Sequence, residues 1–247
     1  MSLGLTYDSI ARRIDHSLLG PTLTTAELEA GCRLAARYGV ASVCIKPYAV
    51  KRAAEILNGS KVAVGTTIGF PHGGHTTSVK VFESRQALDD GATELDMVVN
   101  IGQVLSDEWD AVSSEIGAVT RVAHDAGAIV KVIFENCYLD DHHKARLCAI
   151  CGEVGADYVK TSTGYGSGGS TWDDLRLMRA SAPSTVKLKA AGGIRTLDEM
   201  IRCVEAGCDR IGASRTAEVL DELRKRLGLP PFHVEPASSS RGQESNY

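Results

Sequence analysis

The sequence lacks any apolar run long enough for a membrane-spanning helix. Its first residues, MSLGLTYDSIARRIDHS, have no apolar core of the kind found in secretory signal peptides. A strong charge of one sign is also missing, because 27 Lys and Arg stand against 31 Asp and Glu, for a formal net charge of -4. Such a chain has no general attraction for nucleic acid, although a local basic pocket for a phosphate remains compatible with it. We therefore expect a cytoplasmic protein with neither a nucleic-acid nor a membrane partner.

A disulfide framework is likewise not indicated. The seven cysteines are an odd number, scattered along the chain, so reduced thiols are expected. Cys148 and Cys151 form a C-x-x-C, but they lie in a helical pattern and no second pair completes a zinc site. We interpret them as small apolar residues on a helix face, and Cys44 as a thiol in a buried strand.

The dominant pattern in the 247 residues is a repeat of short apolar, β-branched segments, each followed by an amphipathic stretch. Eight strands are predicted, at Arg13–Leu18, Ala41–Lys46, Val62–Ile68, Thr93–Val99, Ile129–Glu135, Tyr158–Thr161, Val186–Ala190 and Arg210–Ala213. Helices are predicted to begin near Thr24, Ala49, Thr76, Asp107, Asp140, Thr171, Leu197 and Arg215. Strict alternation of strand and helix implies a parallel sheet, and eight units in this length favour a single-domain (β/α)8 TIM barrel. An open doubly wound sheet is the alternative.

The pattern changes after Leu229, where the chain reads PPFHVEPASSSRGQESNY. This composition predicts a barrel domain over residues 1–229 and a polar C-terminal tail over residues 230–247. The tail ends in Tyr247, a phenol that a flexible arm could fold over the active site.

Lysine occurs where a buried strand should be apolar. In YVKTSTGYGSGG (158–169), Lys160 stands where a short strand opens into a loop of Thr, Ser and Gly. Its simplest interpretation is a lysine that reaches solvent at the strand end. However, other predicted strands also carry charges, namely Asp15, Glu94, Asp96, Lys131, Lys187 and Lys189. Several of these charges must share the barrel interior, and neighbouring ammonium groups in a low dielectric lower one another's pKa.

A lysine with a lowered pKa is what an amine nucleophile requires, since only the neutral amine attacks a carbonyl. Asp96 would then move protons, directly or through a water, as the carbinolamine loses water and the iminium exchanges with the enamine. The alternative is a structural charge network in which Asp96 only neutralises a lysine.

Glycine-rich loops after the last strands indicate a phosphate site. Strand seven leads into Gly192 and Gly193, and strand eight contains Gly212 and leads into Ser214. Loops at this place in a barrel commonly hold phosphate through backbone amides and helix N-termini. The loop after strand six could add Thr163 and Gly164, while Arg195 and Arg215 could add charge or simply lie on the surface.

Two histidines after strand three, His72 and His75, offer another chemistry. Their spacing could suit a metal, but no companion ligand is evident beyond Asp15 and His16. We expect no metal here.

Nine segments together resemble one known family, the deoxyribose-phosphate aldolases. They are IDHSLL, SVCIKP, VGTTIGFP, VKVFE, ELDMVVNIG, VKVIFEN, YVKTSTGYG, VKLKAAGGIRT and RIGAS, in the family's order. The match that rests on them covers about residues 8 to 228. The resemblance implies a class I aldolase on a (β/α)8 barrel, without metal or organic cofactor. It implies that Lys160 forms the Schiff base, that Lys189 lowers its pKa and that Asp96 transfers protons.

The family places substrate phosphate near Gly164, Gly192, Gly193, Gly212 and Ser214, and its reaction is the reversible cleavage of 2-deoxy-D-ribose 5-phosphate to D-glyceraldehyde 3-phosphate and acetaldehyde. This reaction belongs to deoxyribonucleotide catabolism. A metal-dependent aldolase and an inactive sugar-phosphate-binding barrel are the alternatives. The outer faces of the predicted helices carry no clear interface signature, and a homo-oligomer is possible.

Overall fold

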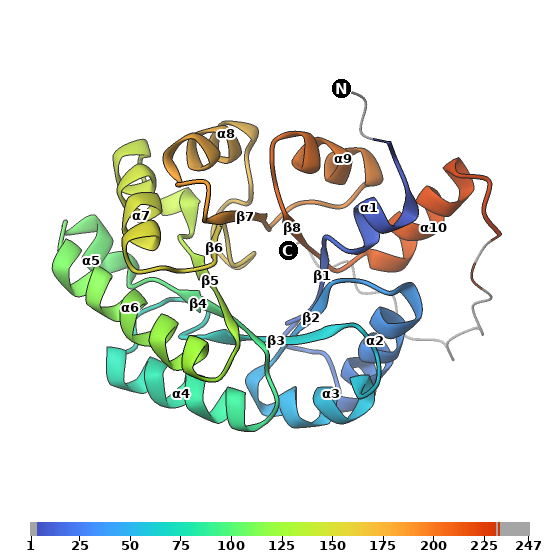
Figure 1. Cartoon of the computed structure of the whole chain (residues 1–247), viewed down its shortest axis with the longest axis horizontal. Coiled ribbons are helices and arrows are strands. Elements are labelled where there is room, and N and C mark those ends of the chain that lie inside the picture. Colours follow the sequence, from blue (N-terminus) through green and yellow to red (C-terminus); the bar gives the residue numbers. More distant parts are fainter. Residues whose placement is uncertain (1–3, 231, 233–247) are drawn as a thin grey trace.

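A computed structural model describes residues 4–230 and 232. In this part of the chain the strands form a closed parallel barrel, in which each strand pairs with the next and β8 pairs with β1 (Figure 1). The strands are β1 Ile14–Leu18, β2 Ser42–Ile45, β3 Ala63–Ile68, β4 Glu94–Val98, β5 Ile129–Ile133, β6 Tyr158–Lys160, β7 Lys187–Ala190 and β8 Arg210–Ala213. The predicted TIM barrel is therefore confirmed, and the open sheet is excluded.

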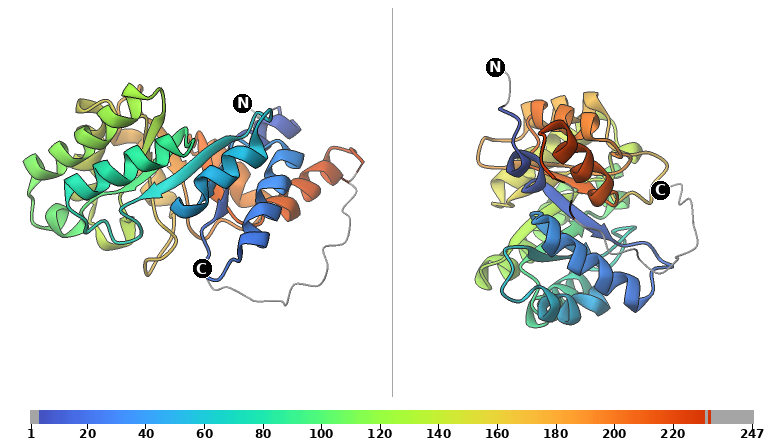
Figure 2. Two further views of the ribbon diagram at one scale, coloured as in Figure 1. Left: turned by 90° about the horizontal axis from the view of Figure 1, so that it is seen from below. Right: turned by 90° about the vertical axis from the view of Figure 1, so that its right-hand side faces the viewer.

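Helices surround the strands on all sides, as the three views in Figures 1 and 2 show. They are α1 Tyr7–Ala11, α2 Thr25–Tyr38, α3 Val50–Leu57, α4 Thr77–Asp89, α5 Ile101–Leu105, α6 Trp109–Asp125, α7 Asp141–Glu153, α8 Trp172–Ser181, α9 Leu197–Glu205 and α10 Thr216–Arg226, with 3-10 turns at Pro47–Ala49 and Asn136–Tyr138. The sequence did not predict α1 or α5, both of which are only five residues long. No helix of the described chain has the length and apolar character to cross a membrane.

Local sequence explains where the helices begin and end. The side chain of Thr24 accepts a hydrogen bond from the Glu27 amide, and Glu27 accepts one from the Thr24 amide, so α2 begins with the expected capping box. After α2, Gly39 has φ +61°, a left-handed conformation that glycine adopts without steric cost.

Apolar side chains make up most of the core, and the buried charged side chains form a small set. Val, Ile and Leu from strands and inward helix faces fill the layer between barrel and helices. Cys148 and Cys151 are buried in α7 within this layer, as predicted, and all seven thiols are free.

The predicted tail lies outside the described residues except for Pro230 and Phe232, and so does Tyr247. The ring of Phe232 packs edge-on against Tyr38, with centroids 4.9 Å apart.

A buried ion pair outside the barrel joins α4 to α6. The Lys80 ammonium donates to a Glu115 carboxylate oxygen and to the Val98 carbonyl, each at 2.8 Å. The same Glu115 oxygen accepts from the Asn100 amide at 3.1 Å. Because Val98 ends β4, the pair fixes both outer helices to the strand that carries Asp96.

Replacing Glu115 by alanine should lower the free energy of unfolding by about 3–5 kcal/mol, because it leaves the Lys80 ammonium buried without its counter-charge. The double variant Lys80→Met/Glu115→Leu is the control, since it removes both charges and should lose much less. Urea unfolding of the three proteins measures the difference. Equal losses in the single and double variants would contradict a role for the unpaired charge.

Candidate active site

Charged side chains from six strands converge inside the barrel. Asp96 lies opposite Lys131 in the β4–β5 register, and Lys160 lies opposite Lys189 in the β6–β7 register. The seven charged groups that contact one another there are Asp15, Glu94, Asp96, Lys131, Lys160, Lys189 and Arg210, which we call the barrel charge network. Their side chains are at most 5% exposed, apart from Arg210 at 15%.

Asp96 stands at the centre of the network. Its Oδ2 accepts hydrogen bonds from the Lys160 and Lys189 ammonium groups, both at 2.7 Å, and its Oδ1 accepts one from Lys131 at 2.8 Å. Burial alone would raise the pKa of Asp96, but the three ammonium groups hold that pKa well below its usual range. Asp96 is therefore a carboxylate at neutral pH. The three residues that the sequence predicts as catalytic are therefore in direct contact, with both lysines bonded to Asp96.

Lys160 is the least neutralised cation of the network. It contacts one carboxylate, whereas Lys189 contacts Asp96 and, at 2.5 Å, Asp15. Lys131 contacts Glu94 at 2.6 Å in addition to Asp96, and lies 3.5 Å from Asp15. In the whole network four cations face three carboxylates, so the network carries one positive charge in excess inside a low-dielectric barrel.

The pKa shifts follow this difference. Burial lowers the pKa of Lys160, and the positive charge of Lys189 adds to the lowering, while Asp96 opposes it. Burial acts on Lys189 as well, but Asp15 and Asp96 outweigh it and raise the pKa of Lys189. The network therefore holds Lys189 as an ammonium and makes Lys160 the amine most ready to lose its proton.

Three neighbouring loops carry the predicted phosphate residues. Gly164 follows β6, Gly192 and Gly193 follow β7, and Ser214 follows β8, and these strands are adjacent in the barrel. Gly164, Gly192 and Gly193 have φ between +82° and +87°. Ser214 is exposed.

At two positions near these loops, Gly169 and Gly212, a larger side chain would meet neighbouring atoms closely. The loops after β6 and β7 touch where a Cβ on Gly169 would lie 2.5 Å from the Gly192 carbonyl oxygen, so the contact requires glycine. Gly212 lies in β8, where a Cβ would stand 3.1 Å from Ala191 Cβ and 3.6 Å from Lys189 Cε. The tight contact at Gly212 is therefore with Ala191, whereas the distance to Lys189 is an ordinary van der Waals contact.

Thr163 has a role in the structure that the sequence did not predict. Its hydroxyl donates to a carboxylate oxygen of Glu135, whose backbone is left-handed at φ +59° in the loop after β5. The Thr163 oxygen also accepts from the Tyr165 amide at 2.9 Å. The Thr163 hydroxyl proton is thus already engaged, and the side chain fixes the start of the Gly164 loop.

His72 and His75 are both exposed in the loop after β3. Within residues 4–230 and 232, no three side chains of His, Cys, Asp or Glu are grouped so that they could hold a metal ion.

Comparison with known proteins agrees with this geometry. Residues 10–216 match the model of the DeoC/LacD family aldolases. The chain belongs to this family. It is 57% identical over 234 residues to deoxyribose-phosphate aldolase of Rhodopirellula baltica, covering 95% of this chain and 97% of that protein. It is 48% identical over 217 residues to the enzyme of the same name from Thermococcus gammatolerans, covering 87% of this chain and 96% of that one.

A solved structure agrees as well. The tetrameric deoxyribose-phosphate aldolase of Aeropyrum pernix superposes with a TM-score of 0.83 at 33% identity, over 90% of this chain and 93% of that one. The resemblance drawn from the nine sequence segments is therefore confirmed.

Two side chains near the site of this DeoC/LacD aldolase were not predicted to belong to it, namely Cys44 beside the barrel charge network and His16 beside the Ser214 loop. The Cys44 thiol lies 4.0 Å from Asp96 Oδ2, and burial raises its pKa to about 11, so it remains protonated. His16 Nδ1 lies 2.8 Å from the Thr216 hydroxyl at the start of α10. Burial lowers the pKa of His16 to about 4, so a neutral ring holds the end of the Ser214 loop.

Arg210 is the member of the network that sequence reasoning missed. It begins β8, and its guanidinium pairs with Asp15 and, at 2.8 Å, with Glu94. Because arginine does not lose its proton in proteins, it supplies a fixed positive charge to this aldolase's interior. Its position as the first residue of a predicted barrel strand is the signal that could have found it.

Proposed function

We propose that this chain is a deoxyribose-phosphate aldolase that reversibly cleaves 2-deoxy-D-ribose 5-phosphate to D-glyceraldehyde 3-phosphate and acetaldehyde through a Schiff base on Lys160. The observation that carries the proposal is the contact of Lys160 and Lys189 with one oxygen of Asp96, in a network with one cation in excess. A sequence relative at 57% identity bears the name of this activity.

The reaction begins with the open-chain aldehyde of the substrate. The neutral Lys160 amine attacks C1 and forms a carbinolamine, which loses water to give an iminium. Asp96 carries protons in these steps, because the carboxylate contacts the Lys160 nitrogen directly. Burial lowers the pKa of Lys160, and Lys189, which remains an ammonium, adds to the lowering through its positive charge.

Cleavage of the C2–C3 bond then uses the iminium as an electron sink. The C3 hydroxyl gives up its proton to the Asp96 carboxylate, directly or through a water, as D-glyceraldehyde 3-phosphate leaves, and the bonding electrons form an enamine on Lys160. Protonation at C2 and addition of water release acetaldehyde and restore the free amine. Neither a metal nor an organic cofactor takes part in these steps.

The phosphate end of the substrate is assigned to the loops after β6, β7 and β8, through Gly164, Gly192, Gly193, Gly212 and Ser214. The left-handed glycines allow the backbone to approach an anion closely. Thr163 supports this site by holding the Gly164 loop against Glu135.

We expect Thr163→Val to raise KM for 2-deoxy-D-ribose 5-phosphate by about tenfold and to change kcat less, because one hydrogen bond to a buried carboxylate is lost and the loop loosens. Thr163→Ser keeps the hydroxyl and should stay near the wild type. Steady-state kinetics of the two variants measures the contrast. A fall in kcat at unchanged KM would assign Thr163 to the chemical step instead.

An assembly of several copies is also proposed. Phe82 at 70% exposure and Tyr48 at 68% are large hydrophobic side chains open to solvent, and such groups are common in subunit interfaces. The Aeropyrum pernix relative is tetrameric. Light scattering on the purified protein should give a mass above one subunit, and a monomer at micromolar concentration would contradict it. The free thiols suit a cytoplasmic location.

A coupled assay tests the activity itself. Purified protein with 2-deoxy-D-ribose 5-phosphate should release acetaldehyde and D-glyceraldehyde 3-phosphate in equal amounts, with no loss of rate after treatment with a chelator. Binding of the substrate without turnover would favour an inactive sugar-phosphate-binding barrel. Loss of activity on chelation that zinc restores would favour a metal-dependent aldolase.

A further inference from the structure

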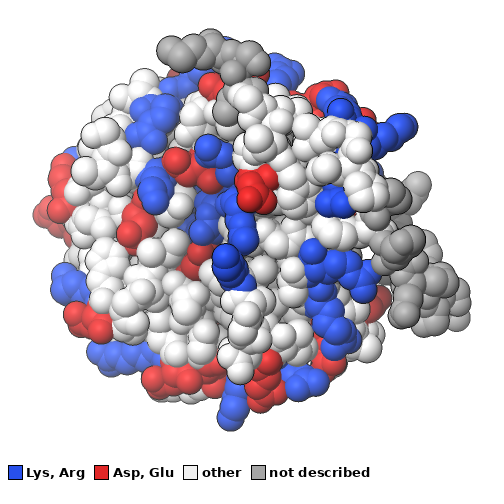
Figure 3. Space-filling view, turned by 45° about the vertical axis from the view of Figure 1, so that its right-hand side comes forward, with Lys and Arg blue, Asp and Glu red and all other residues white. Residues whose placement is uncertain are grey.

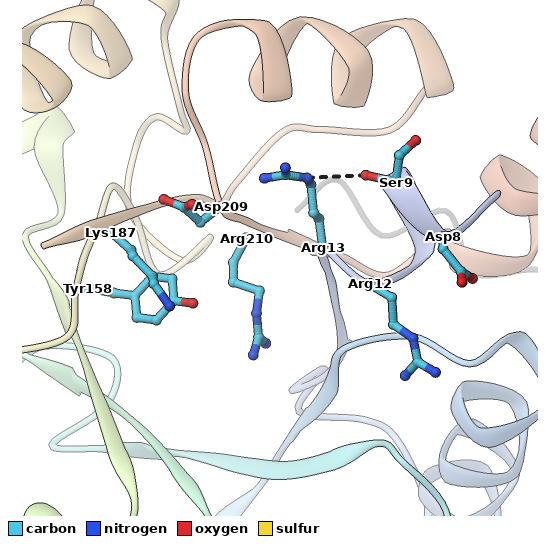
Figure 4. A pocket seen from close by; sticks show the side chains of 8 residues that line it. All are labelled: Asp8, Ser9, Arg12, Arg13, Tyr158, Lys187, Asp209 and Arg210. Atoms are coloured by element: carbon cyan, nitrogen blue, oxygen red, sulfur yellow. Dashed lines mark hydrogen bonds between the residues drawn. The ribbon is translucent and has the colours of Figure 1, made fainter. Parts of the chain in front are cut away.

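A cavity lies at the amino-terminal end of the barrel, away from Lys160. Its volume is about 340 Å³, and it is lined by Asp8, Ser9, Arg12, Arg13, Tyr158, Lys187, Asp209 and Arg210 (Figure 4). Arg12 and Arg13 precede β1, and Tyr158, Lys187 and Arg210 are the first residues of β6, β7 and β8. Lys160 ends β6, so the cavity and the predicted active site lie at opposite ends of the same strands. We call this cavity the basal cavity.

Three cations of the basal cavity have no carboxylate partner in the described chain, namely Arg12, Arg13 and Lys187. Arg13 donates to the carbonyls of Ser9 at 3.2 Å and Cys208 at 2.9 Å, which are neutral groups. The Lys187 ammonium lies 5.5 Å from the centre of the Tyr158 ring. Hydrogen bonds to carbonyls and a ring contact orient these cations but leave their charge uncompensated.

Two carboxylates also line the cavity and reduce its positive charge. Asp209 accepts a hydrogen bond from the Leu188 amide at 3.1 Å, so part of its charge is engaged by the backbone. Asp8 is exposed in α1. Cations outnumber carboxylates even without Arg210. Figure 3 shows Lys and Arg side chains near the middle of one face of the molecule, with Asp and Glu side chains among them.

Arg210 and Tyr158 form the inner wall. The Arg210 guanidinium is already paired with Asp15 and Glu94 in the barrel charge network, so a ligand would be held mainly by the other three cations. Tyr158 is 5% exposed, and its hydroxyl forms no hydrogen bond to any residue that the structure describes. Figure 4 shows Tyr158 and Lys187 on one side of the cavity, Arg12 and Arg13 on the other, and Arg210 between them. The wall thus places the Tyr158 hydroxyl beside the Lys187 ammonium.

We propose that the basal cavity binds a small phosphate-bearing anion, separate from the substrate. Guanidinium groups match phosphate oxygens with paired N–H donors, and a lysine adds a point charge. A volume of about 340 Å³ is at the lower end of small-molecule sites and accommodates pyrophosphate or a sugar phosphate. The proposal does not depend on the aldolase reaction, because it concerns the other end of the barrel.

Two measurements on the full-length protein test the proposal. In crystals soaked in sodium tungstate, a tetrahedral dianion with a strong anomalous signal, a peak should lie within hydrogen-bond distance of Arg12, Arg13 or Lys187. In calorimetric titrations with inorganic pyrophosphate, Arg12→Ala and Lys187→Ala should each weaken binding by roughly threefold to tenfold. These two residues are exposed, so their replacement should not disturb folding.

Two control variants should behave differently, one by tightening pyrophosphate binding and the other by leaving it unchanged. Asp8→Asn should tighten pyrophosphate binding about threefold, because it removes a competing negative charge. Lys51→Ala changes the net charge by the same amount as Lys187→Ala, but on the exposed face of α3, and should change nothing. Tungstate only at the substrate end of the barrel, or binding that is indifferent to Arg12→Ala and Lys187→Ala, would overturn the proposal.

Discussion

Replacing Lys160 by methionine is expected to lower kcat/KM for cleavage of 2-deoxy-D-ribose 5-phosphate by at least about 10⁴-fold, because the covalent route through the Schiff base is closed. Methionine has a similar length and is compatible with a buried site, so the barrel should remain folded. The loss should appear in kcat, since the substrate phosphate contacts are untouched. Steady-state kinetics, with circular dichroism to verify folding, measures it.

Lys160→Arg is the sharper comparison. Arginine retains the positive charge and the donor to Asp96, but its guanidinium does not become a neutral nucleophile in the working pH range. If Lys160 acts as a nucleophile, the arginine variant should be as inactive as the methionine variant. If Lys160 only completes the charge network, arginine should restore much of the rate. Lys51→Met, on the surface of α3, serves as the control for lysine replacement in general.

Replacing Lys189 by methionine should cost about 10²- to 10⁴-fold in kcat and should also move the pH profile upward. In the wild type, four cations face three carboxylates, and the positive charge of Lys189 helps to lower the pKa of Lys160. Without Lys189 the cations and carboxylates are equal in number, so Lys160 holds its proton more tightly. Its pKa rises, the fraction of neutral amine at pH 7 falls, and the ascending limb of activity shifts to higher pH.

Lys189→Arg separates the charge of this residue from its other roles. It keeps the cation beside Asp96 and Asp15, so the pH at which activity rises should stay close to that of the wild type, even if the rate falls. An unchanged pH profile in Lys189→Met would show that Lys189 does not control the protonation of Lys160. Urea unfolding of both variants identifies any loss that comes from stability alone.

The fold could be predicted from the sequence because its signals are local. Each predicted strand coincides with an observed one to within two residues at either end, and β8 has the predicted bounds. The helix that follows β1 begins after the predicted cap, Thr24. The helices that were missed, α1 and α5, are short and carry little of the periodicity on which such predictions depend.

The charged residues inside the barrel could be named from the sequence, but their pairing could not. Lys160 and Lys189 face each other across neighbouring strands, whereas Asp15 and Lys189 are 174 positions apart and meet only because the barrel closes. The pKa values of Lys160 and Lys189 shift in opposite directions because Lys160 contacts one carboxylate and Lys189 contacts two. Thr163 illustrates the same limit, since its hydrogen bond to Glu135 depends on two separate loops.

The most direct test of the account is trapping of the Schiff base. The protein is incubated with acetaldehyde and reduced with sodium borohydride, and the modified lysine is located by peptide mapping and mass spectrometry. We expect one irreversible adduct, on Lys160, with loss of activity in proportion to labelling. An adduct on Lys189 or Lys131 in place of Lys160, or full activity after reduction, would contradict the proposed role of Lys160.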